Sequence, residues 1–311
     1  MARPMARIVV VVVTYNSATL LPDFFDSLDE GLRGVTAEVV VADNASSDSS
    51  VDVTRGCRPD AIVVPMGRNA GYAAGINAAV AAAGDFDAVL ILNPDVRLGA
   101  GCAAELFGAM ARPRTGITVP RLLDAKGDLI WSMRREPTIR RAFADALVGA
   151  ERAGRWAPLG EVNTDDRTYL VDTVTDWAEG STQLVSAECW HSCGPWDESF
   201  FLYSEETEFD LRARDHGFLT RFVASASAVH LEGGSAGSPA LWALLTVNRI
   251  RLFRRRNGRV RTAFFWFASV LRELSRSVLG SRTSRAALRA ILDPRTASVR
   301  PGPDFVKARS R

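Results

Sequence analysis

The sequence predicts an α/β fold, in which a doubly wound parallel sheet is followed by a basic helical C-terminal extension. The first observation is that strand-length apolar runs alternate with helical segments four times in about the first hundred residues. This order is typical of parallel strands joined by right-handed crossovers. The second observation is the charge. Residues 234–311 contain 17 Lys or Arg and 3 acids, a net charge of +14, which leaves −12 for the first 233 residues of a chain whose total is +2.

Each predicted element follows from a local pattern. Residues 8–13 are all β-branched, as expected of a central strand that is buried on both faces. Residues 73–83 are rich in alanine, which favours a helix. Residues 112–170 have little periodicity, and we expect them to cover the edge of the sheet as mobile or partly helical chain. The predicted strands are 8–13, 38–42, 61–64, 88–92, 218–223 and a last one from 227, and the predicted helices include 20–32, 73–83 and 242–252.

The composition is that of a folded globular protein. The 311 residues are 47% apolar and 24% charged, enough for one large domain or two modest ones. The cysteines, Cys57, Cys102, Cys189 and Cys193, match no paired zinc pattern, and we expect reduced thiols in the cytosol. The apolar run after the basic N-terminus is too short for a secretory signal, and no window reaches the length that spans a bilayer.

Polar residues gather directly after the predicted strands. The strand 88–92 is followed by Asn93-Pro94-Asp95, and Pro94 cannot continue a sheet, so Asp95 stands at the carboxyl end of a buried strand. Open α/β sheets bind ligands at this edge, and a divalent cation that bridges two phosphates needs an oxygen ligand. Singly, these residues are explained as well by turns and helix caps; jointly, they favour a nucleotide site. The others are Thr14, Tyr15, Asn16, Asp43, Asn69 and Gly71, with Asn77 in the following helix.

A second cluster combines aromatic residues with acids. The segment Phe-Phe-Leu-Tyr at 200–203 is followed by four acids within six positions, from Glu205 and Glu206 to Asp210. The preference of acids for a helix start explains some of them. A partly buried carboxylate beside others has a raised proton affinity, which a general base needs. His230, one of three histidines, lies shortly before the glycine pair 233–234 and is a candidate metal ligand.

Together these segments resemble the inverting glycosyltransferases of family 2, which have the GT-A fold. The resemblance extends over about 230 residues, and its specificity rests on the order of the pieces. It implies a GT-A-type mixed sheet with a Rossmann-like nucleotide-binding half. The matching pieces are Val12-Val13-Thr14-Tyr15-Asn16, Ala42-Asp43-Asn44-Ala45-Ser46, Asn69-Ala70-Gly71-Tyr72-Ala73, Leu92-Asn93-Pro94-Asp95, the block around Gly180, Asp197-Glu198, Phe200-Phe201-Leu202-Tyr203, Glu205-Glu206 and His230.

The resemblance also implies roles for residues of this chain. Asp95 would bind Mg²⁺ or Mn²⁺ across the diphosphate of a nucleotide-sugar, with His230 as a second ligand. The family's base belongs to a Glu-Asp pair, which here is Glu205-Glu206; Glu206 takes the base position, and which glutamate is the base stays open. The implied acceptor-binding residues are Trp177, Gly180, Asp197 and Glu198. The implied donor-binding residues are Thr14, Tyr15, Asn16, Asp43, Asn69, Gly71, Asn77, Asn93 and Asp95.

On this basis we expect a metal-dependent inverting glycosyltransferase. The expected donor is a dTDP- or UDP-sugar, with dTDP-rhamnose preferred. The expected acceptor is a saccharide linked to a lipid diphosphate, in cell-wall or surface polysaccharide synthesis. One alternative is a galactofuranosyl or other hexosyl transferase acting on a glycan or natural product. Another is a catalytically silent protein that binds nucleotide-sugars and recruits partners to a membrane. This alternative stays open because the Glu-Glu pair departs from the family's Glu-Asp pair.

The basic extension predicts a membrane-surface role. An arginine-rich segment, 249–261, precedes the aromatic run 264–267, a composition typical of interfacial helices on anionic lipid. A basic surface next to an ordinary core helix is the alternative. No recognition motif accompanies the charge, so we expect no nucleic acid partner. We expect a cytoplasmic protein on the inner face of the cell membrane, of open oligomeric state. The expected divisions are 1–111 for the nucleotide-sugar half, 112–236 for the acceptor and catalytic half, 237–280 for the basic helices and 281–311 for a loosely ordered tail.

Overall fold

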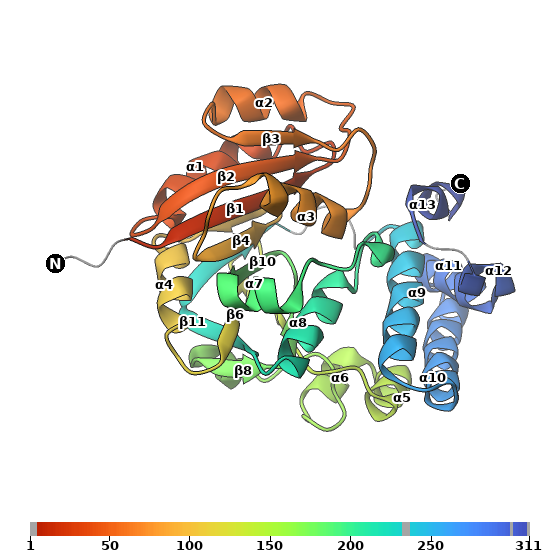
Figure 1. Ribbon diagram of the computed structural model, residues 1–311. Helices are drawn as coiled ribbons and strands as arrows, with labels where there is room; N and C mark the ends of the chain where they lie inside the picture. Colours follow the sequence, from red (N-terminus) through yellow and green to blue (C-terminus); the bar gives the residue numbers. More distant parts are fainter. Residues whose placement is uncertain (1–4, 232–236, 299–300, 310–311) are drawn as a thin grey trace.

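The computed structural model describes residues 5–231, 237–298 and 301–309. The sheet lies at one side of the molecule, and the helices of the C-terminal extension form a group at the other side (Figure 1). The predicted glycine turn at 233–234 lies outside the described residues.

The first part of the chain alternates strands and helices, as the sequence predicted. The strands β3, β2, β1 and β4 are neighbours in that order, and each pair is parallel. Their carboxyl ends therefore lie at one edge of the sheet. The elements are β1 (Arg7–Thr14), α1 (Leu21–Gly31), β2 (Thr36–Asp43), α2 (Ser50–Cys57), β3 (Ile62–Pro65), α3 (Tyr72–Ala82) and β4 (Ala88–Leu92).

The second part makes the sheet mixed, which confirms the GT-A-type expectation. The strand β10 runs antiparallel to both β4 and β6, and the order continues β4-β10-β6-β11-β5. The short strands β7 and β9 pair separately. The elements are β5 (Val96–Leu98), α4 (Cys102–Ala109), β6 (Thr115–Leu123), β7 (Met133–Arg134), α5 (Ile139–Val148), α6 (Ala150–Gly154), η1 (Asp166–Leu170), β8 (Thr173–Thr175), β9 (Trp177–Ala178), β10 (Thr182–Ser186), α7 (Ala187–Cys193), η2 (Glu198–Phe200), α8 (Glu205–Asp215) and β11 (Leu219–His230).

Two strands differ from the sequence prediction. The region 112–170, expected only to cover the sheet edge, contains β6 inside the sheet; Gly116 and Pro120 interrupt its apolar run and hide the pattern. The two strands expected at 218–223 and from 227 are one strand, β11, with a shift of register between Val223 and Ser227. Beyond this shift β11 pairs with β5, and His230 lies opposite Val96.

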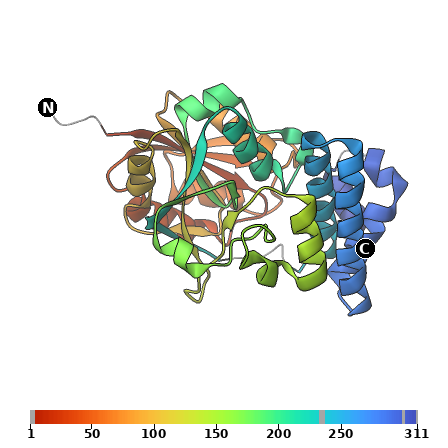
Figure 2. The ribbon, with the colours of Figure 1, turned by 90° about the horizontal axis from the view of Figure 1, so that it is seen from below.

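The extension consists of helices that pack on one another. The helix α9 contacts α10, α11 and α13, and α10 also lies beside α5 of the body (Figure 2). Where we expected a loosely ordered tail, α11 buries Ser284, Ala287 and Ala290. None of the helices in the described ranges is long and apolar enough to cross a bilayer. The helices are α9 (Pro239–Arg256), α10 (Arg259–Val278), α11 (Arg282–Leu292), α12 (Pro294–Ser298) and α13 (Pro303–Arg309).

The core lies on both faces of the sheet. In β1, Ile8, Val10 and Val12 belong to one buried cluster, and the alternating residues between them belong to another. This is the expected result for a strand whose side chains point alternately to two covered faces. A further cluster joins Phe201 to Ala243, Leu244 and Val247 of α9, so the extension packs directly on the segment that precedes α8.

Candidate active site

A cleft of about 580 Å³ opens at the carboxyl ends of the parallel strands. One wall comes from the sheet edge and the start of α8, and the other comes from α9, α10 and the segments around α5 and α6. Residues of the body that line it include Tyr72, Asn93, Asp95, Arg134, Trp177, Glu179, Gly180, Glu205, Glu206 and His230, and residues of the extension that line it include Trp242, Leu245, Arg249 and Arg272.

Asp95 and His230 meet in this cleft because β5 pairs with β11. The backbone N–H of Leu231 donates to the carbonyl of Asp95, and Nε2 of His230 lies 3.4 Å from Oδ2 of Asp95. On the other side of the imidazole, Nδ1 lies 2.9 Å from Oε1 of Glu179. Burial alone would lower the pKa of His230, but the hydrogen bonds to the two carboxylates outweigh it and raise this pKa to about 10.

These side chains suit a divalent cation as a partial ligand set. Oδ2 of Asp95 and Nε2 of His230 face each other, and a cation bound between them would displace the proton that His230 carries, because a ligating imidazole is neutral. A second carboxylate on the far side of a histidine is the usual way to fix a ligating imidazole. Within the described ranges, no group of three or more His, Cys, Asp or Glu side chains is arranged to hold a metal ion. Asp95 and His230 would therefore hold a cation together with oxygens of a bound diphosphate or water.

The two adjacent glutamates have different surroundings. Glu205 is only 1% exposed, and its Oε2 has no partner in the described part of the chain. Glu206 is partly exposed to the cleft and packs on Gly180, where a Cβ atom would lie 2.9 Å from Cβ of Glu206. Burial, with a smaller contribution from the charge of Glu179, raises the pKa of Glu206 to about 7. Burial and the charge of Glu206 raise the pKa of Glu205 well above its usual range.

The other acids of this segment are used inside the protein. Glu208 forms an ion pair with Arg212 one helical turn away. Asp210 is fully buried and accepts hydrogen bonds from the backbone N–H of Ala178 and from Nε2 of Gln183. Glu205 and Glu206 are therefore the members of the acidic cluster that reach the cleft.

The predicted donor residues near β1 and β2 form a tight hydrogen-bonded group. Asp43 is 5% exposed and accepts from the hydroxyl of Thr14 at 2.8 Å and from Ser46. The side chain of Asn16 accepts from the backbone N–H of Ser47. Tyr15, in contrast, is 52% exposed. The carboxylate of Asp43 thus organises the loops at the ends of both strands.

The loop at residues 69–72, called the donor loop because it contains the predicted donor-binding residues Asn69 and Gly71, contacts the segment before α8. Gly71 has a φ of +96°, and a Cβ atom there would lie 2.3 Å from the carbonyl oxygen of Phe201. Only glycine fits this combination of conformation and close approach. Asn69 accepts from the backbone N–H of Gly71, the N–H of Tyr72 donates to the carbonyl of Phe201, and the hydroxyl of Tyr72 donates to the carbonyl of Gly180.

Nine predicted site residues do not line this cleft: Thr14, Tyr15, Asn16, Asp43, Asn69 and Gly71, described above, and Asn77, Asp197 and Glu198. The last three are engaged elsewhere. Asn77 exchanges hydrogen bonds with the backbone of Trp196 and donates to Glu198. Asp197 accepts from the backbone N–H of Ser199 and pairs with Arg255. These contacts fix the segment before α8, so donor binding by Asn77 and acceptor binding by Asp197 and Glu198 stay predictions.

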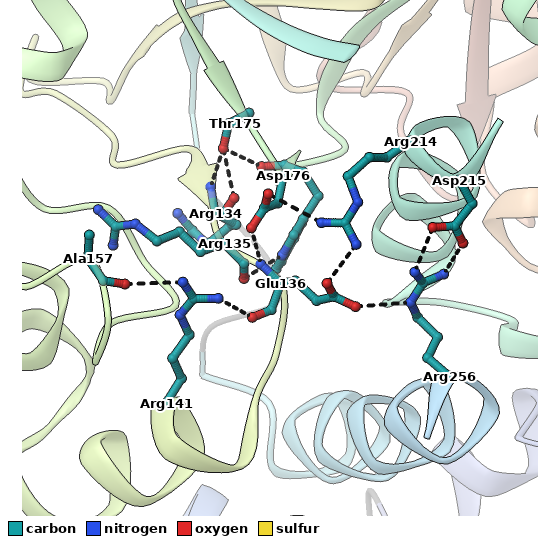
Figure 3. A network of polar contacts seen from close by, with 11 residues as sticks. Arg134, Arg135, Glu136, Arg141, Ala157, Thr175, Asp176, Arg214, Asp215 and Arg256 are labelled. Atoms are coloured by element: carbon teal, nitrogen blue, oxygen red, sulfur yellow. Dashed lines mark hydrogen bonds and ion pairs between the residues drawn. The ribbon is translucent and has the colours of Figure 1, made fainter. Parts of the chain in front are cut away.

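The sequence reasoning missed Glu179 and Arg134. Glu179 directly precedes Gly180, so its place in the block around Gly180 could have identified it as a candidate site residue. Arg134 belongs to β7, inside the aperiodic region 112–170, and its guanidinium lies 5.9 Å from the ring centre of Trp177. Its charge helps to lower the pKa of Glu179 and partly offsets the rise in the pKa of Glu206. The side chains of Thr175 and Asp176 accept hydrogen bonds from the backbone N–H groups of Arg134 and Glu136, which fixes the backbone of this segment (Figure 3).

The mixed sheet, with a carboxylate-histidine pair and a cleft-facing glutamate at its edge, is that of a GT-A glycosyltransferase. The profile of the family described as "Glycosyl transferase family 2" matches residues 9–160. The chain belongs to this family, which confirms the resemblance that the sequence motifs indicated.

Several known proteins are similar to this chain. It is 29% identical over 241 residues to the N-acetylglucosaminyl-diphospho-decaprenol L-rhamnosyltransferase of Mycobacterium tuberculosis, covering 73% of this chain and 77% of that protein. It is 30% identical over 228 residues to the low-salt glycan biosynthesis hexosyltransferase Agl10 of Haloferax volcanii, covering 71% of this chain and 66% of that one. Among solved structures, the mannosyltransferase PcManGT from Pyrobaculum calidifontis, in complex with GDP-Man and Mn²⁺, superposes with a TM-score of 0.58 at 17% identity, covering 99% of this chain and 86% of that one.

Proposed function

We propose that the protein is a metal-dependent inverting glycosyltransferase. It transfers L-rhamnose from dTDP-rhamnose to a saccharide carried on a lipid diphosphate, in the synthesis of a cell-wall or surface polysaccharide. The observation that carries the chemistry is the cleft-facing Glu206, with a pKa of about 7, in the same cleft as the Asp95–His230 pair. The observation that supports the substrates is the 29% identity to a relative named for L-rhamnose transfer to a decaprenyl-diphosphate-linked sugar.

The residues of the cleft divide the reaction between them. Glu206 takes the proton from an acceptor hydroxyl, because a base with a pKa near neutrality is ionised at working pH and still binds a proton strongly. Asp95 and His230 would hold Mg²⁺ or Mn²⁺, which would supply positive charge to neutralise the departing nucleoside diphosphate. Glu179 fixes the imidazole of His230. The acceptor oxygen attacks the anomeric carbon on the face opposite the leaving group, so the configuration inverts.

A second donor class is kept because of one comparison. The relative from Haloferax volcanii, at 30% identity, is named a hexosyltransferase. Transfer of a hexose other than rhamnose would use the same cleft and the same base. The two proposals differ only in the nucleotide-sugar that is consumed.

The lipid-linked acceptor gives a reason for membrane contact, and we infer that the outer face of α10 contacts an anionic membrane surface. Apolar side chains at helical spacing are exposed on this face. Basic side chains are exposed as well: Arg259 and Arg261 at the N-terminal end of α10, and Arg254 in the last turn of α9. The apolar ones are Val260 (72% exposed), Phe264 (54%), Phe267 (53%), Leu274 (46%) and Val278 (78%).

The packing of α10 corrects which residues of the basic extension are available for lipid. Phe265 is 1% exposed and stacks on Phe253, and the indole N–H of Trp266 donates to the carbonyl of Ile291. Arg255 and Arg256 form ion pairs with the body. Phe264 and Phe267 are the members of the aromatic run that supply the apolar contribution.

A donor panel tests the proposed reaction. Purified protein is incubated with a GlcNAc-diphospho-lipid, Mn²⁺ and, in turn, dTDP-rhamnose and UDP- and GDP-hexoses, and the anomeric configuration of the product is read by NMR. We expect transfer from dTDP-rhamnose with inversion, and no turnover by Asp95→Ala although it stays folded. Transfer from a hexose donor alone would replace rhamnose with the second donor class. Retention of configuration, or full activity of Asp95→Ala in saturating Mn²⁺, would contradict the mechanism.

A further inference from the structure

The segment that leads into α8 has an unfavourable backbone. Phe201, Tyr203 and Ser204 have φ values of +68°, +68° and +74°, in the region that non-glycine residues avoid. At Phe201 the ψ is −57°, and the N–H of Leu202 donates to the carbonyl of Phe200, which is a γ-turn of the strained kind. Glu205 and Glu206 follow directly. The direction of both glutamates therefore depends on a conformation that the surrounding structure must enforce.

One side chain of the extension, Asn248, donates hydrogen bonds to three carbonyls of this segment. Asn248 of α9 is fully buried, and its Nδ2 donates to the carbonyls of Phe200 (2.8 Å), Leu202 (2.8 Å) and Tyr203 (3.2 Å). An amide nitrogen carries two hydrogens, so the three carbonyls must turn inward around one donor group. The three acceptors flank or belong to the residues with positive φ.

Further contacts of α9 hold the ends of the same region. Arg255 pairs with Asp197, donates to Ser199, and its guanidinium lies 4.6 Å from the ring centre of Phe200. Arg256 pairs with Asp215 at the far end of α8 and with Glu136 (Figure 3). These ionic contacts are partly exposed, whereas the contacts of Asn248 are buried and reach the strained turn itself.

The opposite side of the turn is held by the donor loop. The carbonyl of Phe201 accepts from the N–H of Tyr72, beside the close approach at Gly71. The strained turn thus lies between the donor loop and α9. A change on either side would redirect Glu206.

We propose that Asn248 is a positioning residue: its amide holds the strained turn at Phe200–Tyr203 and thereby directs Glu206 into the cleft. The helical extension thus has a part in the reaction apart from any contact with lipid. This inference rests on the proposed role of Glu206 as the base. It does not depend on which sugar is transferred.

The test compares two substitutions in the same helix of the full chain. Asn248→Ala removes the donor; the matched control, Thr246→Val, removes a buried hydroxyl that donates only to Trp242 of α9. We expect Asn248→Ala to lower kcat on the order of 10–100-fold, because a small misplacement of a catalytic group has such effects. The Kd for dTDP, measured by calorimetry, should change less than about threefold. Thr246→Val should keep kcat within about twofold.

A second variant and a pH profile test the same proposal independently. Asn248→Ser retains one hydroxyl donor and should give an intermediate kcat; it also serves if Asn248→Ala does not fold. The acid limb of the kcat–pH profile should move in Asn248→Ala and stay fixed in Thr246→Val, which a loss of stability alone would not produce. A folded Asn248 variant with the kcat and pH profile of the unchanged protein would overturn the inference. If Glu206→Gln stays active, the proposed base fails instead, and the two failures are distinguished.

Discussion

At the residue scale, the adjacent glutamates show how surroundings assign chemistry. Glu205 and Glu206 are identical in type, but Glu205 is buried without a partner for Oε2 within the described residues, and Glu206 faces the cleft. A fully buried acid whose pKa is raised well above its usual range stays protonated at neutral pH. Glu206, with a pKa of about 7, can exchange its proton with a substrate. The structure therefore favours Glu206 as the base.

Replacing Glu206 with Gln should remove activity and raise stability. In the unchanged enzyme, kcat should fall about tenfold per pH unit below about pH 7, because the base becomes protonated. Glu206→Gln cannot accept the proton, so kcat should fall on the order of 10²–10⁴-fold at pH 8. Steady-state rates across pH 5.5–9 check both expectations.

The stability change has a defined sign. The folded pKa of about 7 exceeds the ordinary value of 4.5, so between these pH values the folded state holds a proton that the unfolded chain releases. Stability therefore falls as pH rises through this window, and Gln avoids the loss. Thermal unfolding should show Glu206→Gln more stable by on the order of 1–3 kcal/mol at pH 8 and unchanged near pH 4.5. Glu208→Gln, which breaks the partly buried helical ion pair with Arg212, is the control, and an equal gain there would count against this account.

The same scale separates what could be predicted from what could not. That Asp95 and His230 lie together could be predicted, because Asp95 follows β4 and His230 ends β11, and these strand ends lie at one edge of the sheet. Their role as metal ligands stays a prediction. Asn77, Asp197 and Glu198 carry plausible chemistry, but their partners come from other segments, Trp196 and Arg255 among them, and no local pattern reveals such contacts. Arg134 could not be predicted, because its strand β7 is only two residues long and lies in a region of little periodicity.

At the element scale, glycines allow the segments of the site to approach. Gly180 ends the turn before β10 and leaves room for the side chain of Glu206, so the turn and α8 must be considered as one unit. The sequence identified the block around Gly180, but not that it packs on Glu206, the proposed base. That information depends on the packing of α8 against β9.

Gly180→Ala should therefore displace the side chain of Glu206 without changing its carboxyl group. The new methyl would lie 2.9 Å from Cβ of Glu206, too close for contact, so the side chain must shift. We expect kcat to fall on the order of 100-fold and stability to fall by about 1–3 kcal/mol. Gly108→Ala in α4, where a Cβ meets nothing within 4 Å, is the control and should leave kcat unchanged. Rates and thermal unfolding of both variants decide; full activity of Gly180→Ala would contradict the packing argument.

At the scale of the whole molecule, charge predicted the division between body and extension, and periodicity predicted the parallel half. Neither charge nor periodicity predicted that α9 forms part of one wall of the cleft, through Trp242, Leu245 and Arg249. Contacts between α9 and the segment before α8 join residues about 45 positions apart, which no local pattern contains. The extension therefore has two faces: α9 toward the site, and the outer side of α10 toward solvent.

The outer side of α10 leads to a prediction about lipid. The protein should sediment with vesicles that contain phosphatidylglycerol at low salt and should be only partly released at high salt, because the apolar contribution of Phe264 and Phe267 is not screened. Arg259→Gln with Arg261→Gln should weaken binding by on the order of tenfold or more, since each arginine near an anionic leaflet contributes about 1 kcal/mol. The control is Arg33→Gln with Arg55→Gln, which makes the same change in net charge. Arg33 follows α1 and Arg55 belongs to α2, and both helices lie far from α10 in Figure 1, so this pair should have little effect. Phe264→Ser with Phe267→Ser should abolish the binding that survives high salt. Equal weakening by both arginine pairs would reduce the effect to net charge, and equal sedimentation with neutral phosphatidylcholine vesicles would remove the electrostatic contribution altogether.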